Sequence, residues 1–80
     1  MEINKHAISS TLDCSGHLCP VPILMTEEKM SGLKKNEILE VIFTDPGSKP
    51  DLKAWCQANG HEILSFKTHG LKGSALIQKH

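Results

Sequence analysis

The sequence predicts an α+β fold, a two-layer sandwich in which two helices cover one face of a mixed four-stranded sheet. Three observations lead to this fold class. The chain has 80 residues, enough for one hydrophobic core but not for two. Proline and glycine signals divide it into four strand-like and two helix-like segments in the order βαβαββ. Each strand–helix–strand unit is expected to cross over right-handed, which places both helices on the same face.

The first half of the chain begins with a strand and a helix. Residues 1–6 are polar, and we expect them to be flexible within a single domain that spans residues 1–80. Residues 7–13 contain β-compatible side chains and predict the first strand. Pro20 predicts the start of a helix that runs to Ser31, because proline at the first helical position loses no intrahelical hydrogen bond. We expect its buried stripe to contain Ile23, Met30 and Leu33.

The remaining segments give a central strand, a second helix and a hairpin. Residues 38–44, ILEVIFT, are nearly continuously apolar and β-branched, which is typical of a central strand. Pro50 predicts the start of the second helix, and Gly60 is the expected stop signal after it. The segments HEILSFKTH and SALIQK flank the turn GLKG, a pattern that predicts an antiparallel hairpin.

Composition excludes several classes of partner. The chain has nine basic and nine acidic residues, so we expect no direct binding of nucleic acid, which needs a basic surface. No apolar stretch approaches the roughly 20 residues that span a bilayer, and the first residues lack the apolar core of a signal peptide. We therefore expect a cytoplasmic protein that does not insert into membranes. We also expect it to be a monomer. Three cysteines, an odd number, indicate thiols and not a disulfide scaffold.

The most informative stretch is GHLCPVPIL, residues 16–24, because it places Cys19 directly before the predicted helix. The free N–H groups and the positive dipole end at a helix N-terminus favour an anion. We therefore expect Cys19 to have a lowered pKa and a nucleophilic sulfur. Pro20 and Pro22 would hold the thiol, since each proline fixes its own φ. The alternative is that Cys19 is a small apolar residue that fills the junction between strand and helix.

The segment LDCSGHLCPVP, residues 12–22, resembles the L-D-x-x-G-x-x-C-P-x-P signature of the TusA/SirA-like sulfur-carrier family. The stretch TDPGSKPDLKAWCQANGHEIL is similar to the second half of that family. The resemblance covers nearly the whole chain, from Leu12 to about Ile77. Asp13 and Gly16 belong to the signature. The resemblance implies a βαβαββ sandwich that carries sulfur as a persulfide on Cys19. It also implies a cysteine desulfurase or another sulfurtransferase as donor and an acceptor protein downstream, in routes such as tRNA thiolation, molybdenum cofactor assembly or sulfane-sulfur metabolism.

Cysteine and histidine residues near Cys19 have competing interpretations. Cys14 could resolve a Cys19 persulfide or sulfenate as a disulfide, or it could simply pack at the end of the first strand. Cys56 lies on the expected core stripe of the second helix, and we interpret it as packing. The C-x₂-H-x-C spacing of Cys14, His17 and Cys19 matches no common zinc pattern, so we expect neither a metal nor a cofactor. His17 is expected to support the thiolate or to contact a partner.

Charged residues in the second half suggest how the thiol is oriented and approached. Asp45 follows the central strand, and if the first two strands are parallel neighbours it lies near Cys19 and orients this loop or a partner. Alternatively, Asp45-Pro46-Gly47 is only a favourable turn sequence. Lys49 and Lys53, with His17, could form a basic docking rim for an acidic donor, or they could be ordinary solvated lysines. Many members of the family have a basic residue where this chain has Leu18.

Three functions remain open from the sequence. The first is a sulfur carrier of the sulfurtransferase type, with Cys19 as the nucleophile. The second is a binding or regulatory module without catalysis, in which Cys19 is only a helix cap. The third is a thiol redox protein that uses Cys14 and Cys19, although the chain has no C-x-x-C motif.

Overall fold

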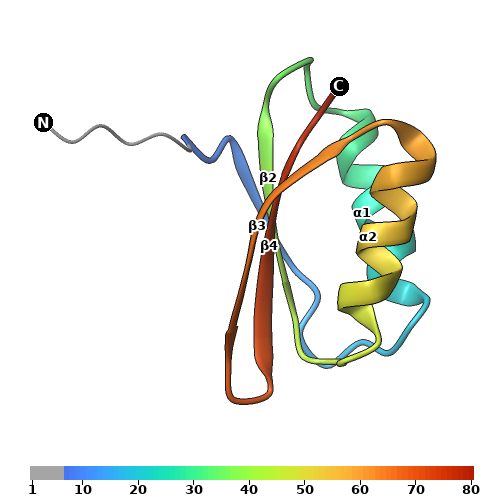
Figure 1. Ribbon diagram of the computed structural model, residues 1–80, viewed down its shortest axis with the longest axis vertical. Helices are drawn as coiled ribbons and strands as arrows, with labels where there is room; N and C mark the ends of the chain where they lie inside the picture. The colour runs from blue at the N-terminus through green and yellow to red at the C-terminus, as the bar shows by residue number, and fades with distance from the viewer. Residues whose placement is uncertain (1–6) are drawn as a thin grey trace, which may run out of the picture.

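A computed structural model describes residues 7–80, so the expected flexibility of residues 1–6 lies outside the described residues. The element order is the predicted βαβαββ (Figure 1). The elements are β1 (Ser10–Asp13), α1 (Val21–Ser31), β2 (Ile38–Phe43), α2 (Ser48–Asn59), β3 (Glu62–His69) and β4 (Lys72–Gln78).

The four strands form one mixed sheet in the order β1-β2-β4-β3. β1 pairs with β2 in parallel, and β4 pairs antiparallel with both β2 and β3. Both helices lie side by side on one face of this sheet, and within residues 7–80 no helix covers the other face (Figure 1). The predicted two-layer sandwich, its central strand and its hairpin are therefore confirmed, although the central strand, predicted over residues 38–44, ends at Phe43.

Several element boundaries differ from the prediction for local reasons. β1 begins at Ser10 and not at residue 7, because its pairing with β2 starts with Ser10 opposite Leu39. α1 begins at Val21 with Pro20 as its N-cap residue, one position later than expected. α2 begins at Ser48, two residues before Pro50, since the first turn of a helix tolerates proline. Gly60 ends α2 in the left-handed conformation, as expected.

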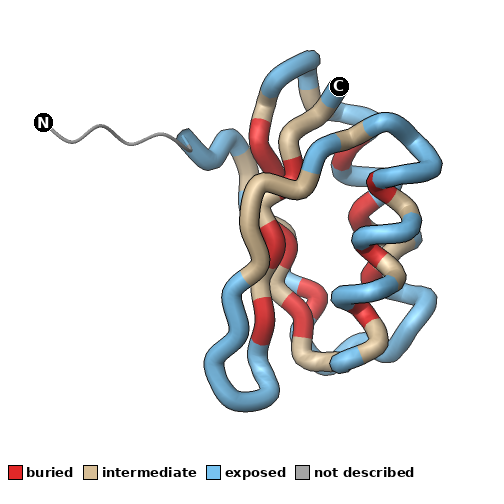
Figure 2. The backbone as a smooth tube through the Cα atoms, in the orientation of Figure 1, coloured by how far each residue is buried: buried red, intermediate tan, exposed pale blue. Residues whose placement is uncertain are grey.

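The core lies between the sheet and the helices (Figure 2). β2 and β4 supply its centre, in agreement with their positions inside the sheet. The stripe of α1 that is fully buried differs from the expected one, because Ile23 and Leu33 pack only at the margin of the core. Its fully buried positions follow an i, i+4, i+8 spacing that faces the sheet, namely Pro22, Thr26 and Met30.

The two ends of the sheet have different roles. The carboxyl ends of the parallel strands β1 and β2 lie at one end, where the loops to α1 and α2 leave the sheet (Figure 1). The beginning of β1 and the end of β4 lie at the opposite end, since Ser10 pairs with Leu39 and Gln78 pairs with Ile38. Just beyond β4, Lys79 Nζ donates hydrogen bonds to the carbonyls of Met30 (2.8 Å) and Leu33 (2.6 Å) at the end of α1.

Candidate functional site

The two loops at the carboxyl ends of β1 and β2 form one surface with Cys19 in it. The β1–α1 loop covers residues 14–20, and the β2–α2 loop covers residues 44–47. Cys19 is exposed to solvent. Both helices also start here, so the first turn of α2 lies next to the loop that carries the thiol (Figure 1).

Backbone hydrogen bonds hold the β1–α1 loop in place. Asp13 Oδ1 accepts the N–H of Ser15 at 2.9 Å, and the hydrogen bonds from Ser15 lower the pKa of the Asp13 carboxyl. Gly16 has φ +83°, a conformation that side chains disfavour, and its N–H donates to Thr44 Oγ1 at 2.9 Å. Asp13 and Gly16 therefore shape the loop but do not contact the sulfur through any hydrogen bond that the structure shows.

Asp45 joins the two loops directly. Its Oδ2 accepts the backbone N–H of Cys19 at 2.8 Å, and its Oδ1 accepts the N–H of Gly47 at 3.2 Å. The expected proximity of Asp45 to Cys19 is therefore confirmed, and it follows from the parallel pairing of β1 with β2. One carboxylate thus fixes the backbone of the thiol loop against the start of α2.

Asp51 was not among the residues predicted for the site. It lies in the first turn of α2 and is half-buried, and the Cys19 thiol donates a hydrogen bond to its Oδ2. The signal in the sequence was an acidic residue directly after Pro50 at the predicted helix start. That position becomes meaningful only because the two helices begin side by side at the same end of the sheet (Figure 1).

The electrostatic environment of Cys19 is opposite to the one expected. The hydrogen bond to Asp51 raises the pKa of the Cys19 thiol, and desolvation by the neighbouring protein atoms and the negative charges of Asp51 and Asp45 act in the same direction. The prediction of a lowered pKa is therefore wrong. A helix N-terminus stabilises an anion by only about 0.3–1 kcal/mol at an exposed site, and two nearby carboxylates outweigh this effect.

Pro20 and Pro22 connect the thiol to the helix. Pro20 is the N-cap residue, and its carbonyl accepts the N–H groups of Ile23 and Leu24, both at 3.1 Å. Pro22 is buried under the first turn, and the Cys19–Pro20 peptide bond is cis. No side chain of the described residues makes a capping hydrogen bond at the start of α1, and the Cys19 thiol turns toward α2. The interpretation of Cys19 as a helix cap is therefore wrong.

The other two cysteines are free thiols inside the core. Cys14 is 0% exposed and Cys56 is 2% exposed. Burial raises the pKa of Cys14, helped by the charge of Asp13, and raises the pKa of Cys56 to about 11. Packing is confirmed for Cys56. The complete burial of Cys14 favours packing over a resolving role, which would need an exposed sulfur.

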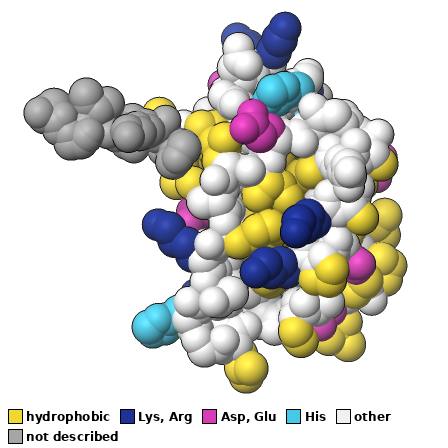
Figure 3. Space-filling view, in the orientation of Figure 1, with side chains coloured by type: hydrophobic (Ala, Val, Ile, Leu, Met, Phe, Trp, Pro, Cys, Tyr) yellow, Lys and Arg dark blue, Asp and Glu magenta, His cyan; other side chains and the backbone are white. Residues whose placement is uncertain are grey.

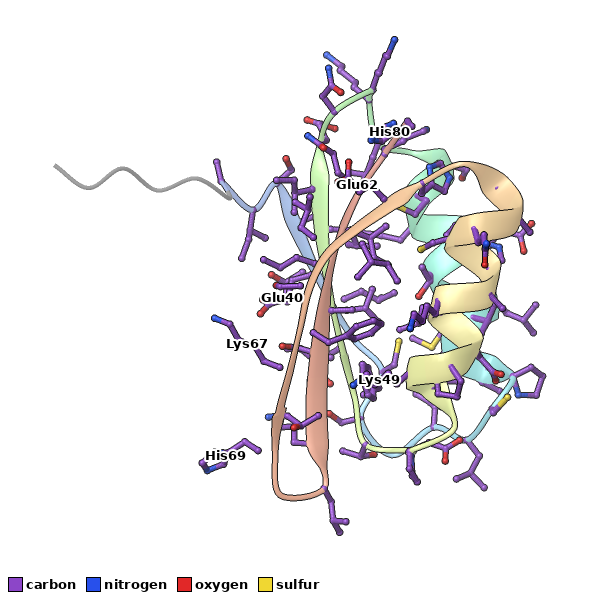
Figure 4. All side chains as sticks on the ribbon, viewed as in Figure 1. Glu40, Lys49, Glu62, Lys67, His69 and His80 are labelled. Atoms are coloured by element: carbon purple, nitrogen blue, oxygen red, sulfur yellow. The ribbon has the colours of Figure 1, made fainter. Side chains whose placement is uncertain are left out.

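The predicted basic rim does not surround the thiol. Lys49 lies over the ring of Phe66 at 5.2 Å, on the helix side of the sheet but toward β3 (Figure 4). Lys53 lines a hollow between α2 and the beginning of β3. His17 is exposed; the pKa of Asp13 is lowered mainly by the hydrogen bonds from Ser15, and the charge of His17 adds only a small contribution. The charges that act on the Cys19 sulfur come from aspartates.

Apolar side chains lie next to the thiol in sequence and are open to solvent. Leu18 is 72% exposed, Leu24 is 59% exposed and Val21 is 38% exposed. Hydrophobic and acidic side chains lie together at the end of the helical layer where both helices begin (Figure 3). We call Leu18, Val21 and Leu24 the apolar collar. The segment around Cys19 thus exposes apolar side chains, and the charges that act on its sulfur are acidic.

The described residues also bear on metals and membranes. Across residues 7–80, no three His, Cys, Asp or Glu side chains come together in an arrangement that could hold a metal ion. None of the helices in this part of the chain is long and apolar enough to cross a bilayer.

Comparisons with known proteins agree on one family. Residues 10–79 match the family model described as Sulfurtransferase TusA. The sulfur carrier protein TusA of Allochromatium vinosum is 40% identical over 68 residues, which are 85% of this chain and 90% of that protein. YrkF of Bacillus subtilis is 46% identical over 59 residues, which are 74% of this chain and 32% of YrkF. The chain spans about a third of YrkF and of a relative from Aquifex aeolicus.

The fold has a counterpart among solved structures. The crystal structure of a SirA-like protein from Desulfitobacterium hafniense superimposes with a TM-score of 0.68. The match covers 89% of this chain and 99% of that protein, at 20% sequence identity. At this identity the match supports the two-layer α+β architecture alone.

Proposed function

The chain belongs to the TusA sulfurtransferase family, and from this premise we propose that it is a sulfur carrier that holds its cargo as a persulfide on Cys19. The observation that carries the proposal is the exposure of this one thiol. Cys19 is open to solvent, whereas Cys14 and Cys56 are buried. Cys19 is therefore the cysteine that two partner proteins can reach in turn.

The chemistry that we propose needs no oxidant. In loading, the thiolate of Cys19 attacks the outer sulfur of a persulfide on the donor protein. A new S–S bond forms on Cys19, the S–S bond of the donor breaks, and the donor cysteine leaves as a thiolate that takes up the proton lost by Cys19. In delivery, a thiolate of the acceptor attacks the outer sulfur, and Cys19 leaves as the thiolate. The moving sulfur keeps its oxidation state throughout.

The loop architecture supports this exchange. Pro20, Pro22 and the Asp45 hydrogen bond hold the Cys19 backbone, so that the side chain starts from the same position for each partner protein. Asp13 and Gly16 stabilise the preceding turn. A fixed nucleophile loses less conformational freedom on reaching the reactive geometry, which favours transfer.

The apolar collar supports docking of protein partners around the sulfur. We propose that a cysteine desulfurase or another sulfurtransferase is the donor and that a downstream sulfur-acceptor protein follows it on the same surface. Exposed leucines become favourable contacts when a partner covers them. We place this relay in the cytoplasm, since a persulfide carrier needs a compartment in which thiols stay reduced.

Sulfur loading can be tested by mass. The purified protein is incubated with a cysteine desulfurase and cysteine and is then weighed intact without reductant. We expect one added sulfur atom on the wild type and none on Cys19→Ser, whereas Cys14→Ala and Cys56→Ala should load like the wild type. Absence of the added sulfur from the wild type, or its presence on Cys19→Ser, would contradict the proposal.

A further inference from the structure

The hydrogen bond between Cys19 and Asp51 has no part in the transfer steps described above. It connects the loop before α1 with the first turn of α2, across 32 positions of sequence. An exposed thiol is ordinarily solvated by water, but the Cys19 thiol donates a hydrogen bond to the carboxylate of Asp51, which is itself half-buried. A buried or half-buried group that contacts the reacting atom directly is placed to affect its chemistry.

The charged groups that face the Cys19 sulfur are all acidic. Asp51 approaches from α2, and Asp45 approaches from the β2–α2 loop. His17 belongs to the same loop as Cys19, and its charge acts on Asp13. Lys49, in the same helical turn as Asp51, lies over Phe66. No described cation therefore offsets the two carboxylates through a contact that the structure shows.

We propose that Asp51 is a positioning residue for the sulfur transfer proposed above, one that holds the unloaded Cys19 as a neutral thiol against α2 and releases it once it carries sulfur. The proposal rests on the proposed carrier function for its second half. Its first half rests on the geometry of the unloaded protein alone.

The release of the loaded Cys19 from Asp51 follows from the negative charge of the persulfide and from its additional S–S bond. A persulfide ionises more readily than a thiol, so the loaded site carries a negative charge on its outer sulfur. That sulfur lies about 2 Å beyond Sγ. An anionic persulfide cannot donate the hydrogen bond to Asp51, and the two like charges repel each other. The loaded sulfur is thereby directed away from α2 and toward solvent, where an acceptor can attack it.

The effect of Asp51 on the unloaded Cys19 thiol can be measured without any sulfur donor. The rate of alkylation of Cys19 by iodoacetamide is measured from pH 6 to pH 10 in the wild type and in Asp51→Asn, which keeps the shape and removes the charge. We expect the midpoint of the pH profile to fall in Asp51→Asn and the rate at neutral pH to rise about threefold. The gain in thiolate outweighs the smaller nucleophilicity of each thiolate.

Controls separate this role from a structural one. Glu27→Gln removes the same charge from the exposed side of α1 and should leave the profile unchanged. Asp51→Glu keeps the charge and should stay close to the wild type. Asp51→Ser is a second neutral variant, in case Asp51→Asn folds poorly, and should also lower the midpoint.

The possible results discriminate between the two proposals. A pH profile in Asp51→Asn and Asp51→Ser identical to that of the wild type would overturn the role of Asp51, whatever the protein does with sulfur. Conversely, a lowered midpoint in a protein that takes up no sulfur from a desulfurase would support the contact and contradict the carrier function.

Discussion

Asp45 accepts the backbone N–H of Cys19 at 2.8 Å although the two residues are 26 positions apart in the chain. The same carboxylate accepts the N–H of Gly47 at the start of α2. One side chain thus sets where the thiol loop lies relative to both helices. The position of the sulfur therefore depends on the β2–α2 loop as much as on its own loop.

Replacement of Asp45 should loosen the thiol loop. In Asp45→Ala the N–H groups of Cys19 and Gly47 lose their acceptor, and we expect the free energy of unfolding to fall by about 1 kcal/mol. Amide hydrogen exchange measured by NMR should become faster at both residues. Asp45→Asn, which keeps one acceptor oxygen, should show a smaller change. Unaltered exchange at Cys19 in Asp45→Ala would mean that this hydrogen bond does not restrain the loop.

The three thiols should differ sharply in reactivity. In native protein at pH 8, excess iodoacetamide should modify one cysteine, because Cys14 and Cys56 are buried and their pKa values are raised. In denaturant all three should react. Intact mass counts the added groups, and Cys19→Ser should remain unmodified under native conditions. A second group on the native wild type would show that the core opens at Cys14 or Cys56.

The apolar collar should matter to protein partners and not to small donors. We expect Leu18→Ser to raise the KM for loading by a desulfurase about tenfold, since an exposed anchor contributes on the order of 1–2 kcal/mol to binding. Loading by a small persulfide such as glutathione persulfide should change little, because the substitution adds no charge beside Cys19. Ile8→Ser is the matched control, because Ile8 is also exposed but precedes β1 at the opposite end of the sheet. Equal effects of the two variants would argue against docking at the collar.

Gly73 is the glycine among the described residues at which an added Cβ would lie nearest to another side chain. A Cβ at this position would lie 2.5 Å from Phe43 Cε1 and 2.7 Å from Cζ, so Phe43 would have to move. We expect Gly73→Ala to lower the free energy of unfolding by about 1–3 kcal/mol in chemical denaturation. Gly32→Ala should change it by no more than about 0.5 kcal/mol, because its Cβ would lie at ordinary contact distance, 3.7 Å from the Lys29 carbonyl. Comparable stability of the two variants would mean that Phe43 moves aside without cost.

Much of the fold could be predicted because its signals are local. Apolar runs, proline at helix starts and Gly60 at a helix end depend on neighbouring residues, and they gave the correct order of elements. Boundaries depend on distant pairing, which explains the shifts. β1 is shortened because Ser10 is its first residue paired with β2. The early start of α2 at Ser48 likewise depends on its loop, where the Ser48 N–H donates to the Asp45 carbonyl.

The positions of two site residues could be predicted from the sequence, but the electrostatics of the site could not. Cys19 follows from its position before a helix, and Asp45 follows from the rule that parallel strands end at one edge. The direction of the Cys19 pKa shift could not be predicted in the same way. The dipole of α1 can be inferred from the local sequence, but the contact with Asp51, 32 positions away, depends on the tertiary fold. The basic rim of Lys49 and Lys53 was wrongly predicted for a related reason. The helix that carries both lysines was correctly predicted, but the contact of Lys49 with Phe66 depends on how this helix packs against β3.

The separation of the two ends of the sheet has an architectural consequence. The start of β1 and the end of β4 leave the domain opposite Cys19, and Lys79 fastens the latter to the end of α1. A linker, an affinity tag or a neighbouring domain attached through either end would therefore not obstruct the approach to the thiol. A domain with this layout can form part of a longer polypeptide while its Cys19 thiol stays accessible to partner proteins.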